Sequence, residues 1–344
     1  MAAVAELEPI GVTPVPVTGP NAPILSVRDL TIEFDSPSGP LRAVDGVSFD
    51  LRRGQTLGLV GESGSGKTTA VMGLLRLLPP GGRVVRGSVV FDGEDLLTLG
   101  ADRLRALRWS RLSIVFQGAM NALNPVRTVG DQISEALRTH EQALTRREVQ
   151  ARTGELLRRV GIGASRGSEY PHTFSGGMRQ RAMIALALAC RPDVIIADEP
   201  TTALDVMIQT QILELLVGLA REFGMGTIIV THDLGVVAQV CDRVIVMYGG
   251  QVAEDADVTT IYGAPRHPYT QLLLKAFPNV EEVDRTLRSI PGTPPRLDAL
   301  PPGCRFAPRC PFAFERCAVE VPPPYVQDGA SAHRAACFLV ETDG

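Results

Sequence analysis

A glycine-rich loop constrains this chain more than any other feature of its sequence. Residues 61–68 read Gly-Glu-Ser-Gly-Ser-Gly-Lys-Thr, which fits the pattern G-x-x-x-x-G-K-[ST], and they follow an apolar run at 56–60 that is expected to be a buried strand. Glycines let successive backbone N–H groups curl around phosphate oxygens, and the N-terminus of the helix expected next adds positive partial charge. We therefore predict a nucleotide site at residues 61–68, called the phosphate loop below.

The side chains that end the phosphate loop have separate expected roles. Lys67 would reach the β- and γ-phosphates, and Thr68 would ligate magnesium. A chance glycine-rich turn between a strand and a helix is the alternative reading of the loop. The residues predicted to contact the nucleotide are Gly61, Glu62, Ser63, Gly64, Ser65, Gly66, Lys67, Thr68 and Thr69.

Candidate catalytic residues follow two further apolar runs. Asp198 and Glu199 come directly after the run 194–197; Asp198 would hold magnesium through water, and Glu199 would orient or deprotonate the attacking water. Taken alone, adjacent acids after a strand are more often a solvated turn or a helix cap. His232 follows the run 227–230, and its imidazole can both donate and accept hydrogen bonds, as a sensor of the γ-phosphate would need.

The order of the apolar runs predicts an α/β fold. An amphipathic stretch at 209–223 separates the runs 194–197 and 227–230, which is typical of a parallel sheet with crossover helices. The candidate residues all stand where these strands end, the edge at which open α/β sheets bind ligands. The other expected elements are a helix from the phosphate loop to about Leu78, a mixed-charge helix at 145–160, and a strand pair at 243–247 and 251–254.

A third motif narrows the choice among proteins with such a loop. Residues 174–180 read Phe-Ser-Gly-Gly-Met-Arg-Gln and resemble the signature of the ABC ATPases, usually Leu-Ser-Gly-Gly-Gln, at the start of an expected helix. Ser175, Gly176 and Gly177 would form a second phosphate cradle at that helix N-terminus. The alternative is an ordinary helix start with Ser175 as its N-cap. Met178, where glutamine is usual, departs from the family pattern.

The resemblance spans about residues 24–262 and implies further site residues. Gln117 resembles the Q-loop glutamine, with a catalytic role and a magnesium contact, and Asp205 the nucleotide-binding aspartate of the D-loop. Phe34 matches the aromatic residue that stacks on adenine, although it shares a strand face with Leu30 and Ile32 and has a competing claim as a core residue.

The resemblance also implies a fold and an assembly. The expected fold is a P-loop ABC nucleotide-binding domain at 24–264, with a RecA-like parallel-sheet core, an antiparallel β subdomain and a helical subdomain at about 118–190. ATP would lie between the Lys67 loop of one protomer and the signature of another in a head-to-tail dimer. Residues 1–23, which hold five prolines, are expected to be a flexible tail.

The C-terminal region, 265–344, resembles that of ATPases from bacterial dipeptide and oligopeptide importers. The resemblance rests on His-Pro-Tyr-Thr at 267–270, Gly-Cys-Arg-Phe at 303–306 and Pro-Arg-Cys-Pro at 308–311. It implies a peripheral subunit at the cytoplasmic face of the inner membrane, with a second and different ATPase, two permease subunits and an extracellular solute-binding protein as partners. Relatives in that group also carry nickel, glutathione or other peptide-like solutes.

Four of the six cysteines crowd this region, while Cys190 and Cys241 are isolated and are expected to be buried packing residues. Tight C-x₂₋₄-C knuckles typical of structural zinc are absent, and an iron–sulfur cluster can draw its thiolates from wider loops. The family resemblance points to a 4Fe–4S cluster in some members; zinc and unliganded thiols are the alternatives. The proposed ligands are Cys304, Cys310, Cys317 and Cys337.

Composition and spacing weigh against other classes. The net charge of −4 supplies no global basic field for nucleic acid, and no apolar run approaches the ~18–20 residues of a membrane span. ABC ATPases that act on nucleic acid or chromosomes usually insert long coiled coils or zinc modules between the phosphate loop and the signature. That interval here holds no sustained heptad repeat and no cysteine. We expect an importer ATPase with no nucleic-acid partner.

Overall fold

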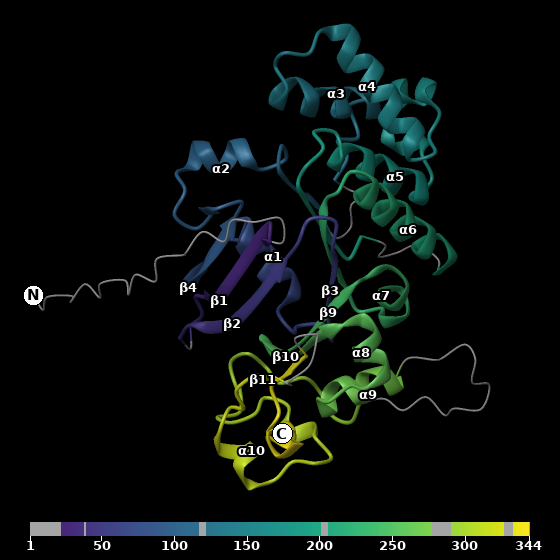
Figure 1. Ribbon diagram of the computed structural model, residues 1–344. Helices are drawn as coiled ribbons and strands as arrows, with labels where there is room; N and C mark the ends of the chain where they lie inside the picture. Colours follow the sequence, from purple (N-terminus) through teal and green to yellow (C-terminus); the bar gives the residue numbers. More distant parts are fainter. Residues whose placement is uncertain are drawn as a thin grey trace, which may run out of the picture.

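The described residues form two sheets (Figure 1). The computed structural model describes residues 22–37, 39–116, 122–200, 206–276, 290–326 and 333–343. The smaller sheet is antiparallel. Its strands, in spatial order, are β2 (Leu41–Leu51), β1 (Leu25–Phe34), β4 (Gly82–Phe91) and β5 (Glu94–Asp95).

The larger sheet is mixed and carries the core of the fold. Its order is β11 (Tyr325–Val326), β12 (Arg334–Ala335), β10 (Gln251–Asp257), β9 (Arg243–Tyr248), β3 (Thr56–Val60), β8 (Gly226–Thr231), β7 (Val194–Asp198) and β6 (Leu112–Val115). Neighbours from β9 to β6 pair in parallel, whereas β10, β12 and β11 pair antiparallel. Every residue of β3, β7 and β8 is buried, as parallel strands covered on both faces require. The predicted α/β fold is confirmed.

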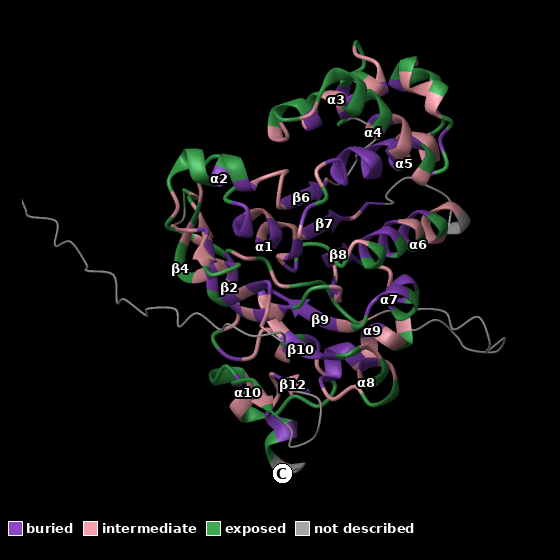
Figure 2. Cartoon of the chain, turned by 45° about the horizontal axis from the view of Figure 1, so that its top comes forward, coloured by how far each residue is buried: buried purple, intermediate pink, exposed green. Residues whose placement is uncertain are grey.

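Helices pack around these sheets, and Figure 2 shows burial gathered in the strands while α2 and α3 carry much exposed surface. In Figure 1, α3 and α4 stand together beyond one end of the sheets. The α-helices are α1 (Lys67–Leu74), α2 (Ala101–Leu107), α3 (Val129–His140), α4 (Arg146–Arg159), α5 (Gly176–Ala187), α6 (Val206–Glu222), α7 (Leu234–Val240), α8 (Val258–Gly263), α9 (Pro268–Ala276) and α10 (Glu315–Val319). Short 3₁₀ turns are η2 (Ala164–Ser168), η3 (Pro171–Thr173), η4 (Ala307–Arg309) and η5 (Phe338–Asp343).

Helix α1 is shorter than the sequence indicated, ending at Leu74 and not near Leu78. Arg76 adopts a φ of 51°, its N–H bonds the carbonyl of Gly73 at 3.0 Å, and the next N–H bonds that of Met72 at 2.9 Å. This is a Schellman motif, which satisfies the last carbonyls of a helix and stops it. The expected helix at 145–160 is confirmed as α4, whose start is fixed by a capping box between Thr145 and Glu148.

The C-terminal region is not the separate, cysteine-rich appendage expected from the sequence. Strand β12 extends the large sheet by pairing with β10. Tyr269 and Phe306 are buried in the same hydrophobic cluster as Val60 and Val246 of the parallel strands. The region therefore shares both a sheet and a core with the rest of the chain.

His267 lies at the junction between these parts and is 3% exposed. Its ring Nδ1 accepts a hydrogen bond from the backbone N–H of Tyr269 at 3.0 Å, which caps α9. The backbone N–H of His267 donates to the Glu254 carboxylate at 3.1 Å. Burial lowers the pKa of His267 to about 4. The folded protein therefore holds this imidazole neutral under conditions in which an unfolded chain would protonate it.

We expect His267→Asn to flatten the loss of stability in acid. The folded pKa of about 4 lies below the unfolded value of ~6.5, so stability falls as pH drops below ~6.5 and the loss is complete near pH 4. The full contribution is roughly 3 kcal/mol. Asparagine keeps an acceptor for the cap but does not titrate. Thermal unfolding at pH 7 and pH 5 measures the effect, with exposed His172→Asn as the control; equal pH dependence in both variants would contradict it.

Candidate nucleotide site

Parallel pairing brings the predicted site residues to one edge of the large sheet. Val60 at the end of β3 is level with Thr231 of β8, and Asp198 at the end of β7 is level with Val230 of β8. The phosphate loop, Glu199 and His232 follow directly after these three strand ends. Residues more than 100 positions apart in the sequence therefore meet at the carboxyl edge, as the strand order predicted.

Two glycines of the phosphate loop are required by its path. Gly61 has a φ of 148°, and a Cβ there would lie 2.2 Å from the carbonyl oxygen of Met247. Gly66 has a φ of 96°, and a Cβ there would lie 2.5 Å from the carbonyl oxygen of Ala43. Helix α1 begins immediately after Gly66, so its free N–H groups face the loop. The backbone thus forms a preformed anion cradle.

Lys67 is held inside the phosphate loop by the loop itself. Its Nζ donates to the carbonyl oxygens of Gly61 at 2.7 Å and Glu62 at 2.9 Å, and to the hydroxyl of Ser65 at 3.3 Å. The residue is 5% exposed, and burial lowers the pKa of its ammonium group although nearby carboxylates oppose that shift. A buried ammonium surrounded by carbonyl dipoles is positioned to receive phosphate oxygens.

Thr68 and Asp198 form a pair suited to a hard cation. The Thr68 hydroxyl donates to Asp198 Oδ1 at 3.0 Å, while Oδ2 of this fully buried carboxylate has no hydrogen-bond partner among the described residues. Burial raises the pKa of Asp198. A hydroxyl and a carboxylate are oxygen ligands that Mg²⁺ takes, and a cation would compensate the orphaned oxygen. These residues fit magnesium.

Glu199 and His232 meet on the solvent side of this pair. Nδ1 of His232 lies 3.5 Å from Oε1 of Glu199, and the histidine side chain is 65% exposed while that of Glu199 is 18% exposed. Glu199 has a φ of 42°, a strained conformation for a non-glycine residue, and its N–H bonds the carbonyl of Val230. The backbone thus directs one carboxylate toward the strand ends, where a water molecule could be activated.

The phosphate loop also has partners that the sequence did not suggest. The N–H of Glu62 donates to the hydroxyl of Tyr269 at 2.9 Å, and the Glu62 carboxylate pairs with both terminal nitrogens of Arg309, at 2.6 and 3.0 Å. Both partners lie in the C-terminal motifs on which the family resemblance rests. No spacing rule connects them to position 62, which is 247 residues from Arg309.

The signature residues lie at the start of α5. Among the described residues, no contact joins them to the phosphate loop, Asp198, Glu199 or His232. Ser175 is exposed, and its hydroxyl accepts the N–H of Met178 at 3.3 Å, so it is the N-cap of α5. Met178 is half-buried, with its sulfur 3.1 Å from a nitrogen of Arg166. Gly176 and Gly177 form the first turn of the helix. In this single chain Ser175 therefore acts as the helix N-cap, which is the alternative expected from the sequence. Because Ser175 is exposed, the helix N-terminus is accessible to a partner.

Three other predicted residues stand differently. Phe34 ends β1 and packs against the first hydrophobic core, close enough to Gly82 that a Cβ there would lie 2.6 Å from its ring. The ring of Phe34 therefore makes the contacts expected of a core residue, which is the alternative to stacking on adenine. Gln117 and Asp205 fall outside the described residues, so their predicted roles remain predictions.

The cysteine prediction is not supported as a metal site. Cys304, Cys310, Cys317 and Cys337 do line one small pocket together with Phe306 and Phe338. Burial raises the pKa of Cys337 to about 11 and raises that of Cys304 and Cys310. However, within the described ranges no group of three or more His, Cys, Asp or Glu is arranged to hold a metal ion. The four thiols share a pocket, but the described residues show no metal site there.

Comparison with known proteins identifies the family. Residues 44–202 match the family model described as ABC transporter, and residues 253–317 match that described as oligopeptide/dipeptide transporter, C-terminal region. The chain is 45% identical over 325 residues to the oligopeptide transport ATP-binding protein AppD of Bacillus subtilis, covering 93% of this chain and 98% of that one. It is 46% identical over 303 residues to the dipeptide transport ATP-binding protein DppD of Escherichia coli, covering 87% and 92%.

This chain belongs to the ABC transporter ATP-binding family. A dimeric ATP-binding cassette solved in a post-hydrolysis state with ADP and Pi has 28% identity and a TM-score of 0.61, covering 68% of this chain and 98% of that one. The P-loop ABC ATPase fold expected from the sequence is thereby confirmed, and the enzyme class is an ATPase. Within the part of the chain that the structure describes, no helix is long and apolar enough to cross a membrane.

We expect Glu199→Gln in this ABC ATPase to abolish hydrolysis and retain ATP binding. A carboxylate beside the Thr68–Asp198 pair can accept a proton, whereas an amide cannot. Loss of a general base typically slows turnover by ~10²- to 10⁴-fold. Phosphate release by the assembled transporter and equilibrium ATP binding are the measurements, with Lys67→Ala as the variant that should lose binding too. Near-normal turnover of Glu199→Gln would remove this residue from the role.

Proposed function

We propose that this chain is the ATPase subunit that powers import of dipeptides or oligopeptides. The observation that carries the proposal is that Lys67, Thr68, Asp198, Glu199 and His232 gather at one sheet edge in a chain whose C-terminal region matches that of oligopeptide and dipeptide transporters. The similarity to AppD, an oligopeptide transport protein, and to DppD, a dipeptide transport protein, supports the same solute class. Nickel, glutathione or another peptide-like solute is the alternative.

In the proposed cycle each residue acts on the triphosphate. The Nζ of Lys67 gives up its hydrogen bonds to the loop carbonyls and donates to β- and γ-phosphate oxygens, because charged oxygens are the stronger acceptors. Thr68 and Asp198 would hold magnesium, which would neutralise phosphate charge. Glu199 takes the proton of the attacking water, and His232 contacts the γ-phosphate. Gln117 would sense the metal and Asp205 the nucleotide, as the family resemblance implies.

We propose that the ATPase works as a dimer with a second, different cassette subunit. Ser175 is exposed at the N-terminus of α5, where Gly176 and Gly177 leave backbone N–H groups uncovered by side chains. A partner's nucleotide would complete this cradle, and this chain's nucleotide would use the partner's signature. The dimeric cassette solved with ADP and Pi supports such an assembly.

The division of the chain follows from this assembly. Residues 24–264 are proposed as the ATPase domain, 118–190 as its helical subdomain, 265–344 as the importer-type C-terminal region and 1–23 as a tail. A groove between α3, α4 and η2, lined by Asp131, Arg138 and Arg158 among others, is a candidate docking site for a loop of the permease. Two permeases and an extracellular solute-binding protein would place the chain at the cytoplasmic face of the inner membrane.

Reconstitution tests this function. We expect the chain, its partner ATPase and the permeases in proteoliposomes to hydrolyse ATP faster when the binding protein is loaded with a dipeptide or a longer peptide. Nickel and glutathione, offered in the same assay, separate the alternatives. Stimulation by either of these and not by peptides would contradict the proposed solute.

The dimer has its own test on purified protein. We expect the chain alone to be monomeric by light scattering and to turn over ATP slowly, because each site lacks the partner's signature. Adding the partner cassette should raise turnover, and a Ser175→Arg variant should block this by filling the helix N-terminus while leaving ATP binding to the chain intact. A monomer with full turnover would contradict the composite site.

We further propose that the four C-terminal thiols are ligands of a 4Fe–4S cluster. Their shared pocket supports this, since a 4Fe–4S cluster is held by four cysteine thiolates. Anaerobic purification should then yield about four iron atoms and matching sulfide per chain, with visible absorbance that Cys310→Ser removes. Stoichiometric zinc without iron, or no metal at all, would overturn the proposal.

A further inference from the structure

Arg309 is fixed in place before it reaches the phosphate loop. Its Nε donates to the carbonyl of Pro291 at 2.7 Å and its Nη1 to the Tyr248 hydroxyl at 3.2 Å. Its N–H closes the η4 turn on the carbonyl of Phe306 at 2.9 Å. The side chain is only 5% exposed, whereas arginine side chains usually lie at the surface. Its Nη2 also donates to the carbonyl of Ile290 at 3.4 Å. A guanidinium held on several sides keeps its two-pronged contact with Glu62 in one fixed geometry.

Tyr269 provides a second tether on the same loop residue. Its hydroxyl accepts the backbone N–H of Glu62 at 2.9 Å, and its ring is fully buried. The ring lies 4.6 Å from that of Tyr248 and 5.3 Å from that of Phe306, measured between centroids. Both the side chain and the backbone of Glu62 are therefore held by residues packed into one aromatic cluster.

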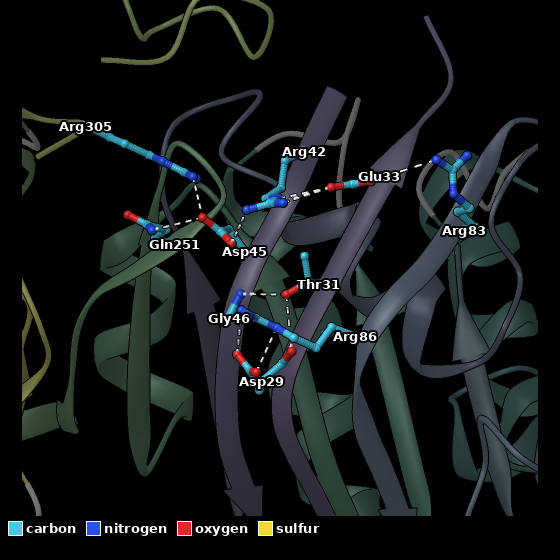
Figure 3. A network of polar contacts seen from close by, with 10 residues as sticks. All are labelled: Asp29, Thr31, Glu33, Arg42, Asp45, Gly46, Arg83, Arg86, Gln251 and Arg305. Carbon is cyan, nitrogen blue, oxygen red and sulfur yellow. Dashed lines mark hydrogen bonds and ion pairs between the residues drawn. The ribbon is translucent and has the colours of Figure 1, made fainter. Parts of the chain in front are cut away.

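Arg305, four residues earlier, acts on the other flank of the loop. It donates to the carbonyl of Gly249. It also donates to the carboxylate of Asp45, as Figure 3 shows. The neighbouring Gly250 donates its N–H to the carbonyl of Ser65 at 3.0 Å and accepts the N–H of Asp45 at 2.8 Å. The segment between Cys304 and Cys310 thus contacts the phosphate loop directly at Glu62 and through Gly249–Gly250 at Ser65.

The charge of Glu62 gives these contacts a consequence for nucleotide binding. The carbonyl of Glu62 binds Lys67 at 2.9 Å, so its carboxylate belongs to the residue that lines the cradle. An unpaired carboxylate there would repel a triphosphate, and the repulsion would be large because the surroundings are partly buried. The bidentate pair with Arg309 neutralises that carboxylate and holds it against the C-terminal region.

We propose that Arg309 is a positioning residue of the ATP site: by holding and neutralising Glu62, it makes nucleotide affinity depend on the cysteine-flanked segment 304–310. In this role the segment acts on the site through Glu62. This inference needs only ATP binding to the loop and does not depend on the transported solute or on a metal at the thiols.

Equilibrium binding of a fluorescent ATP analogue to the full chain tests the proposal. Arg309→Met should weaken affinity at least about fivefold, which is the lower range of coupling between sites. Glu62→Gln added to Arg309→Met should recover most of that loss, because the repelling carboxylate is gone. Arg316→Met is the matched control: Arg316 lies in the same region, pairs with Glu320 and Glu341, and does not contact the loop, so affinity should stay unchanged.

Thermal unfolding and limited proteolysis, recorded for each variant, show whether it is folded. If Arg309→Met does not fold, Arg309→Lys replaces it; the single charge remains but the two-pronged contact is lost, so we expect a smaller loss of affinity, again relieved by Glu62→Gln. Unchanged affinity in folded Arg309 variants would overturn the proposal. So would an equal loss in Arg316→Met, or a double variant no better than the single one, because each would mean that Arg309 only stabilises the fold.

Discussion

Parallel pairing of β3 with β8 and of β8 with β7 is the constraint on which the site depends. It fixes the ends of three strands at one level, and the phosphate loop, Glu199 and His232 can only follow from those ends. The strands are buried throughout, so their register cannot slip without exposing apolar residues. The relative positions of the candidate site residues therefore depend on how the buried strands pair.

The site holds groups that its ligands would satisfy. In the part of the chain that the structure describes, the hydrogen bonds of the buried Lys67 Nζ go to loop oxygens, and the buried Asp198 Oδ2 has no partner. Both are costly without a counter-charge. Triphosphate would compensate the first and magnesium the second, so binding energy is available where the nucleotide is to be held. The path of the phosphate loop requires glycine at 61 and 66, because the backbone angles and close contacts at these positions leave no room for a side chain.

The sequence allowed the gathering of the candidate residues at one sheet edge to be predicted, because their motifs depend on local chemistry. The phosphate loop, the acids at 198 and 199 and His232 needed only strand ends and residue types. Arg309 and Tyr269 could not be found in this way, since their pairing with Glu62 arises from how β10, α9 and the C-terminal region fold back on the loop. The idea of a separate appendage was wrong for the same reason: nothing local shows that β12 joins the large sheet.

The central claim is that Lys67, Thr68 and Asp198 together hold the magnesium–nucleotide complex at the edge of the large sheet. A crystal structure of Glu199→Gln grown with ATP and magnesium tests it most directly. The account predicts Lys67 Nζ on β- and γ-phosphate oxygens, and the metal between the Thr68 hydroxyl and Asp198 in place of their present 3.0 Å hydrogen bond. A nucleotide bound with Lys67 still on the carbonyls of Gly61 and Glu62, or a metal away from Thr68 and Asp198, would contradict it.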